Sequence, residues 1–112
     1  MKRNYTFLLN DIISSCDNIL DFVSGYNFEL FKNDKKTISA VIREFEVIGE
    51  AANNLPESIT KKYTDIQWDE IIGMRHRLIH GYFGVDYELV WFTIQHNVQK
   101  LITDIQQIIT DL

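Results

Sequence analysis

The chain has 112 residues, of which 46% are hydrophobic and 24% are charged. This length suits one domain over residues 1–112, and the composition excludes a disordered chain, which would have fewer apolar residues and a larger excess of charge. The formal net charge of −5 argues against indiscriminate binding of nucleic acid, although it leaves room for one local basic site.

The cysteine content and the first residues indicate a protein of the cytoplasm. Cys16 is the single cysteine, so an intrachain disulfide is excluded and no oxidising compartment is required. The N-terminus lacks the apolar region of a signal peptide. The apolar runs are far shorter than the roughly 20 residues of a membrane-spanning helix, and we expect no membrane association.

The first predicted helix extends from Tyr5 to Val23, because its apolar residues recur at the i, i+3, i+4, i+7 spacing of an amphipathic helix. Cys16 lies on this apolar stripe, where a thiol acts as a small hydrophobic group. Gly25 is a natural stop for the helix. Residues 26–33 then form a short connector, which we expect to be packed down by Phe28, Leu30 and Phe31.

The second predicted helix begins at a cap provided by Asn33 or Asp34, and Pro56 ends it. Its apolar stripe consists of Ile38, Val41, Ile42, Phe45, Ile48, Ala52 and Leu55. Gly49 belongs to a patch of small residues late in the helix, which lets a neighbouring backbone approach closely. A short helix over about residues 57–63 follows.

Two further long helices complete the predicted fold. One begins near Asp65 and ends at the glycines Gly81 and Gly84, and the other runs from a cap at Asp86 to the C-terminus. The last helix carries an unbroken heptad seam of Tyr87, Trp91, Ile94, Val98, Leu101, Ile105, Ile108 and Leu112. The sequence therefore predicts an all-α protein, an up-and-down bundle of four long helices plus a short helix.

The basic stretch MRHRLIHGYF, over residues 74–83, differs from an ordinary core helix. On a continuous helix His76 and His80 project from one face, about 40° apart, and Arg75 reaches round the same edge. A histidine can exchange protons with RNA hydroxyls near neutral pH, and an arginine can hold a phosphate by two hydrogen bonds. Tyr82 can bind a phosphate or stack on a base. This set suits RNA cleavage without a metal ion.

Other interpretations of the same residues stay open. Cations at the end of a helix are favoured by the helix dipole alone, by about 0.3–1 kcal/mol each. A zinc site at His76 and His80 lacks an evident third ligand. Glu46 and Glu50, four residues apart in the second helix, can order the arginine or a histidine by ion pairing, but solvated carboxylates are the more common case. We expect His96 to be an ordinary surface residue.

The string RHRLIHGYF resembles the signature of HEPN domains, in which an arginine, a polar residue, three further residues and a histidine follow one another. It also resembles the longer HepT form, with Arg75, His80, Gly81 and Tyr82 at matching places. The stretches FEVIGEAANNLPE (residues 45–57) and GVDYELVW (84–91) are similar to HepT-like proteins in the same order. His76 departs from the pattern, since asparagine is frequent at that place.

The resemblance implies a homodimeric helical bundle that brings two motifs together across a cleft. It implies a metal-independent endoribonuclease without a cofactor, acting as the toxin of a toxin–antitoxin system of type II or type VII. The implied partner is a minimal nucleotidyltransferase antitoxin, which transfers AMP to the motif tyrosine, here Tyr82. Such a modification would add charge and bulk to a site that must admit RNA phosphate.

We therefore expect His80 to be the principal acid/base and Arg75 the phosphate clamp, with His76 and Tyr82 in support. Arg77 is interpreted as a surface or interface cation. Two facing motifs would also double the local positive charge of an acidic chain. The exposed part of the heptad seam and the small-residue patch near Gly49 are candidates for the dimer interface.

Two alternatives to the ribonuclease are a binding module and a purely structural cluster. In the first, a HEPN-like dimer engages a nucleotidyltransferase partner or a nucleotide without cutting RNA. In the second, the basic cluster only caps a helix.

Overall fold

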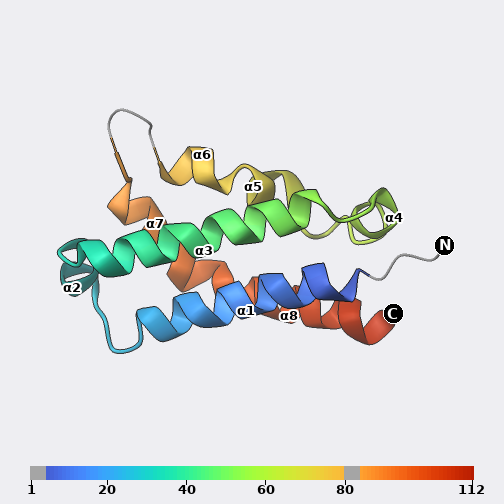
Figure 1. Ribbon diagram of the computed structural model, residues 1–112, viewed down its shortest axis with the longest axis horizontal. Coiled ribbons are helices and arrows are strands. Elements are labelled where there is room, and N and C mark those ends of the chain that lie inside the picture. Colours follow the sequence, from blue (N-terminus) through green and yellow to red (C-terminus); the bar gives the residue numbers. More distant parts are fainter. Residues whose placement is uncertain (1–4, 80–83) are drawn as a thin grey trace.

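The computed structural model describes residues 5–79 and 84–112, and this part of the chain is helical with no β-strand (Figure 1). The helices are α1 (Thr6–Phe22), α2 (Phe28–Lys32), α3 (Lys35–Asn53), α4 (Glu57–Thr60), α5 (Trp68–Ile72), α6 (Met74–Leu78), α7 (Tyr87–His96) and α8 (Val98–Asp111). The predicted all-α class is confirmed. Two of the four predicted long helices are interrupted in the structure.

Helix α1 follows the prediction closely. Leu9, Ile12, Cys16 and Ile19 are fully buried along one face. Burial raises the pKa of the Cys16 thiol to about 12, and the nearby Asp17 carboxylate contributes to the shift. The chain turns at Gly25, whose φ of 78° lies in the left-handed region that glycine adopts without strain.

The connector after α1 contains one more helical turn than expected. The Asn27 side chain accepts a hydrogen bond from the backbone N–H of Leu30 at 2.9 Å and so caps α2. Phe31 is fully buried, as predicted, but Leu30 is 55% exposed and does not pack down. Helical geometry explains the difference, because neighbouring residues of a helical turn point about 100° apart.

Helix α3 begins at the predicted cap. Asp34 accepts hydrogen bonds from the Thr37 backbone N–H at 3.1 Å and from the Tyr26 hydroxyl at 2.6 Å. These bonds, first from Tyr26 and then from Thr37, lower the pKa of the Asp34 carboxyl to about 2. All seven residues of the predicted stripe are buried.

The third predicted helix is divided at Gly73 into α5 and α6 and ends at Leu78, ahead of the expected glycines. Ile79 is extended, with φ −120° and ψ 116°, and forms an isolated antiparallel bridge with Val85. Glycine is the weakest helix former apart from proline, and β-branched isoleucine tolerates extended backbone well, which accounts for both changes.

The last predicted helix is divided at Asn97 into α7 and α8. The Asp86 side chain caps α7 by accepting from the Leu89 backbone N–H at 3.1 Å, as predicted. The heptad seam is buried from Ile94 to Ile108, whereas its ends at Tyr87 and Leu112 are 38% and 62% exposed. The seam therefore packs mainly within the chain.

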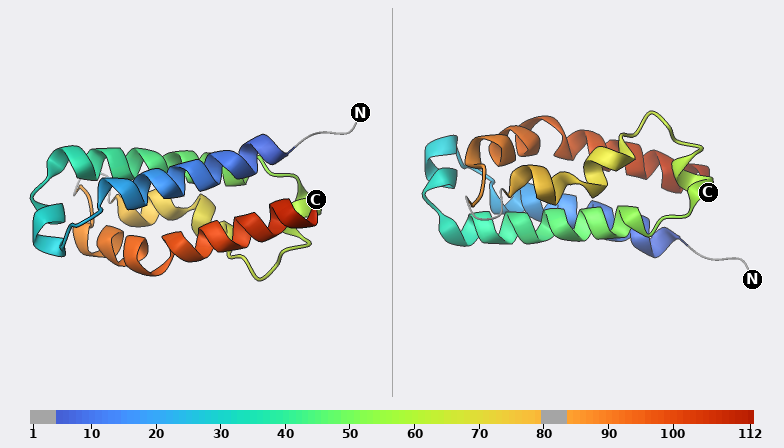
Figure 2. Two further views of the ribbon diagram at one scale, coloured as in Figure 1. Left: turned by 90° about the horizontal axis from the view of Figure 1, so that it is seen from below. Right: turned by 90° about the horizontal axis from the view of Figure 1, so that it is seen from above.

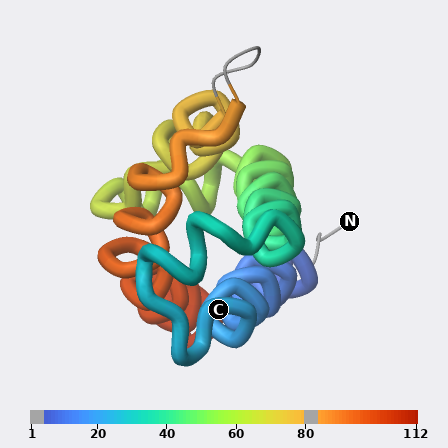
Figure 3. Tube along the Cα trace, turned by 90° about the vertical axis from the view of Figure 1, so that its left-hand side faces the viewer, coloured from blue at the N-terminus to red at the C-terminus, as the bar shows by residue number. Residues whose placement is uncertain are grey.

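Helix α1 lies between α3 and α8, while α5 and α6 pack on α3 (Figures 1 and 2). The end-on view in Figure 3 shows the helices arranged around one interior. None of the described helices is long and apolar enough to cross a membrane. Helix α6, which carries the first part of the basic segment, thus stands beside the middle of the longest helix.

Candidate functional site

Helix α6 is anchored by its two apolar residues and presents its cations to solvent. Met74 and Leu78 are 5% and 1% exposed, and their i, i+4 spacing places both on the face toward the core. Arg75, His76 and Arg77 are exposed. The local sequence therefore produces a basic surface on a helix of one turn.

Arg75 forms an ion pair with Glu46 of α3. The distance from Arg75 Nε to Glu46 Oε2 is 3.3 Å, and the side chains are 54% and 35% exposed. Glu50 is exposed and has no ion pair among the described residues. On sequence alone, Glu46 and Glu50 are equal candidates for the partner of Arg75. The structure shows that Glu46 is the partner and lies at the candidate site.

A signal for Glu46 was present in the sequence. Glu46 precedes Gly49 by three residues, so both lie on the same side of α3. A Cβ atom at Gly49 would lie 3.3 Å from the carbonyl oxygens of Ile71 and Ile72, which means that α5 touches α3 at this glycine. The predicted close approach is confirmed, and any side chain on that face of α3 lies near the α5–α6 segment.

The same contact corrects the prediction of the Gly49 patch as a dimer interface. Gly49, Ala51 and Ala52 are buried within the chain. The patch is therefore already covered within the chain, with Gly49 against α5, and offers no surface to a second subunit.

Two of the four predicted site residues, His80 and Tyr82, lie outside the described residues, so their distances to Arg75 and His76 stay untested. Helix α6 ends at Leu78 and Ile79 is extended, so the continuous helix on which the expected common face of His76 and His80 depended ends ahead of residues 80–83. The Ile79–Val85 bridge and a hydrogen bond from Asp86 N to Leu78 O at 2.8 Å bring together the residues that flank 80–83.

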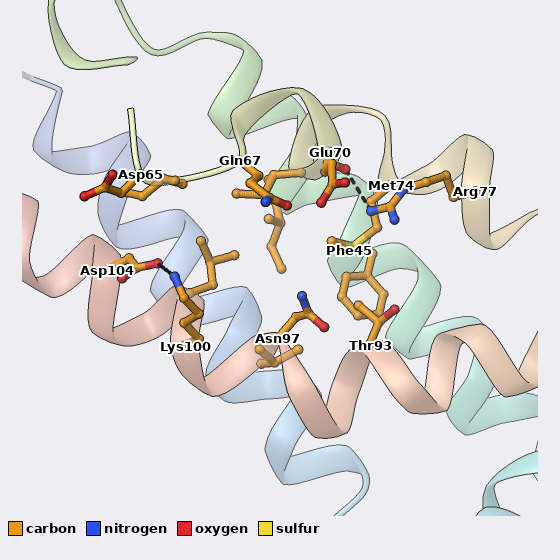
Figure 4. Close-up of a pocket in the computed structure, with 15 residues that line it drawn as sticks. Phe45, Asp65, Gln67, Glu70, Met74, Arg77, Thr93, Asn97, Lys100 and Asp104 are labelled. Atoms are coloured by element: carbon orange, nitrogen blue, oxygen red, sulfur yellow. Dashed lines mark hydrogen bonds and ion pairs between the residues drawn. The ribbon is translucent and has the colours of Figure 1, made fainter. Parts of the chain in front are cut away.

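Arg77 faces a different region from Arg75. It lines a pocket of about 270 Å³ between α5–α6 and α7–α8, whose floor includes Phe45 and Met74 (Figure 4). Arg77 Nη2 donates to the carbonyl oxygen of Glu70 at 3.1 Å. Its exposure agrees with the prediction of a surface cation, and Arg75 is not among the residues that line this pocket.

Residues that bind metals do not gather in the described part of the chain, where no three His, Cys, Asp or Glu side chains are placed to hold an ion. His96 is exposed, as predicted, and its ring stacks on Phe92 with centroids 4.2 Å apart. The chemistry available at α6 is therefore that of an arginine held by a carboxylate, next to an exposed imidazole.

An all-helical chain with this basic segment has the architecture of a HEPN-like protein. The model of the family "Ribonuclease HepT-like" matches residues 12–108. The chain belongs to the HepT-like ribonuclease family, which confirms the resemblance seen in the sequence.

Similar proteins cover almost the whole chain. "Putative RNase MJ0127" of Methanocaldococcus jannaschii is 41% identical over 99% of this chain and 92% of its own length. "Putative RNase MJ0125" of the same organism is 43% identical over 99% of this chain and 96% of its own length. "Probable ribonuclease HepT" of Thermococcus cleftensis is 42% identical over 90% of this chain and 92% of its own length. No solved structure matches the chain significantly.

Proposed function

We propose that this chain is a metal-independent endoribonuclease that cleaves RNA with Arg75 and His80. The observation that carries the proposal is the HepT-like family match over residues 12–108, which includes the segment with Arg75, His80 and Tyr82. The exposed Arg75 guanidinium, which pairs with Glu46 through Nε, is compatible with a phosphate clamp.

The proposed reaction is an internal transfer at phosphorus. His80 takes the proton of a 2′-hydroxyl, the 2′-oxygen attacks the adjacent phosphorus, and the bond to the 5′-oxygen breaks. The leaving 5′-oxygen takes up a proton from water, and His80 returns its proton to water, so the products are a 2′,3′-cyclic phosphate and a 5′-hydroxyl. Arg75 stabilises the charge that builds on the non-bridging phosphate oxygens, with His76 and Tyr82 in support.

We further propose that the active form is a homodimer in the cytoplasm and the toxin of a toxin–antitoxin pair. A second copy would add its own Arg75 and His76 to the cleft, which would raise the local positive charge of a chain with net charge −5. The exposed ends of the heptad seam at Tyr87 and Leu112 are available for contacts with a second copy. A minimal nucleotidyltransferase would neutralise the toxin by transferring AMP to Tyr82.

The test is cleavage of total cellular RNA by the purified chain in EDTA. Wild type should cleave and leave 2′,3′-cyclic phosphate ends, while Arg75→Ala and His80→Ala should each be slower by about 10²–10³-fold. Arg43→Ala is a matched control, because Arg43 is an exposed arginine of α3 outside the site. Intact mass should show an unmodified Tyr82 in the active sample.

Two results would contradict the proposal. Cleavage that survives both substitutions would place the chemistry elsewhere or in a contaminant. An inactive wild type with unmodified Tyr82 would favour the non-catalytic module, and a tight complex with a nucleotidyltransferase would then support that alternative.

A further inference from the structure

We propose that Glu46 is a positioning residue, which holds the Arg75 guanidinium by its Nε so that the two terminal nitrogens face the RNA phosphate. This inference rests on the proposed function, since it takes Arg75 as the phosphate clamp. The inference assigns a role to a residue of α3 that lies outside the RHRLIHGYF segment.

The contact leaves the phosphate-binding end of the arginine open. Glu46 Oε2 lies 3.3 Å from Nε, and Arg75 has no other ion pair or side-chain hydrogen bond among the described residues. A guanidinium donates five hydrogen bonds in a rigid fork, and its two terminal nitrogens together match two oxygens of a phosphate. A carboxylate at Nε therefore attracts the inner edge of the fork without occupying its outer end.

The exposure of the two side chains agrees with this division of roles. The Arg75 side chain is 54% exposed, so a polynucleotide could contact it from solvent. The Glu46 side chain is less exposed, at 35%. Ion pairs this exposed add little to the free energy of unfolding, typically below about 1 kcal/mol. The ion pair instead restricts the rotation of the Arg75 side chain before RNA binds. This restriction favours binding of the transition state rather than folding.

The element that carries Glu46 is much better anchored than the element that carries Arg75. Helix α3 has 19 residues and a continuous buried face, whereas α6 has five residues. The contact of Gly49 with the carbonyl oxygens of Ile71 and Ile72 fixes the spacing between α3 and α5, one turn of α3 away from Glu46. Glu46 thus ties the short helix of the site to the most regular helix of the fold.

The alternative role for Glu46 is to compete with phosphate for Arg75. The two roles predict opposite effects on RNA cleavage when Glu46 is removed. Removal of a competitor would strengthen RNA binding and speed cleavage, whereas removal of a positioning residue slows cleavage. The contact through Nε favours positioning, because a competing carboxylate is expected at the two terminal nitrogens, where a phosphate would bind.

The experiment is steady-state cleavage of a defined RNA oligonucleotide by wild type, Glu46→Ala, Glu46→Gln, Glu50→Gln and Arg75→Ala. Glu46→Ala should lower kcat about tenfold with KM changed less than about twofold, because a misplaced arginine is felt in the transition state. Glu46→Gln should fall between the alanine variant and wild type, since an amide oxygen keeps a partial negative charge near Nε but lacks the full charge of the carboxylate. Glu50→Gln removes a carboxylate one turn further along α3 and should leave both constants unchanged.

A second measurement follows the contact directly. The NMR signal of the Arg75 Nε–H group, assigned by its loss in Arg75→Lys, should shift in Glu46→Ala and stay in place in Glu50→Gln. Equal melting temperatures of the variants would exclude a loss of fold as the cause of the kinetic change.

The two proposals fail in different variants. Cleavage by Arg75→Ala at the wild-type rate, or no cleavage by wild type, overturns the proposed function and with it this inference. An inactive Arg75→Ala beside a fully active Glu46→Ala overturns the positioning role alone. Faster cleavage by Glu46→Ala does the same, because it identifies Glu46 as a competitor.

Discussion

Substitution of Gly49 by alanine tests whether the α3–α5 contact sets the geometry of the candidate site. A Cβ atom at this position would lie 3.3 Å from two backbone carbonyl oxygens, those of Ile71 and Ile72. Neither oxygen can rotate away, because each belongs to the backbone of α5. The neighbouring helix must therefore move by a few tenths of an ångström as a unit.

Two opposing terms decide the change in stability. Alanine in place of glycine favours a helix by about 1 kcal/mol. Overpacking of a buried contact costs about 1–3 kcal/mol, and the upper half of this range applies when backbone has to shift. We expect a net destabilisation of about 1 kcal/mol, which corresponds to a melting temperature lower by about 4 °C for a domain of this size.

The assay is thermal unfolding followed by circular dichroism, with Ser39→Ala as the matched control. Ser39 is an exposed residue of α3, so its substitution should be neutral or slightly stabilising. RNA cleavage by Gly49→Ala should also decline, since the shift of α5 carries α6 and Arg75 away from Glu46. A Gly49→Ala protein as stable and as active as wild type would refute the reasoning that this close approach positions Arg75.

Three further predictions concern the core, the buried thiol and the cap of α3. Ile105 of α8 is fully buried, so Ile105→Ala should lower the free energy of unfolding in urea by about 2–5 kcal/mol, and a loss below about 1 kcal/mol would mean that α8 is not fixed in the core. Cys16, whose pKa burial raises to about 12, should not react with a thiol reagent at pH 8 until urea unfolds the chain, and rapid labelling of the folded protein would contradict its burial. The pKa of Asp34 is about 2 in the folded chain and near 3.9 in an unfolded one, so the unfolded chain binds more protons between these two pH values. The contribution of Asp34 to the stability of the folded chain is therefore present above about pH 4 and is lost as the pH falls toward 2. The difference in melting temperature between wild type and Asp34→Asn should therefore shrink over that range, and a difference independent of pH would show that the carboxylate charge is not responsible.

Much of the fold could be predicted because a helix depends on the spacing of residues that are close together in the sequence. The stripes of α1 and α3 and the caps at Asp34 and Asp86 depend on residues within a few positions of one another, and all of them are found in the structure. The breaks at Gly73 and Asn97 could not be placed, because the apolar pattern continues through both positions.

The candidate site could be predicted in part. Its cations are adjacent in the sequence, and the exposure of Arg75 and His76 follows from the burial of Met74 and Leu78 on the opposite face of α6. The continuous helix assumed for His76 and His80 ends at Leu78, and the extended Ile79 follows it. Local periodicity cannot foresee that ending, because the bridge joins Ile79 to Val85, on the other side of residues 80–83.

The sequence by itself determined the all-helical class, most of the core and the family, since each depends on residue types at fixed spacing along the chain. Only the tertiary structure decided which carboxylate meets Arg75. Glu46 and Glu50 have the same chemistry and lie on the same helix, and their difference arises from where α5 crosses α3 at Gly49. That crossing is set by the packing of side chains far apart in the sequence, which no local pattern contains.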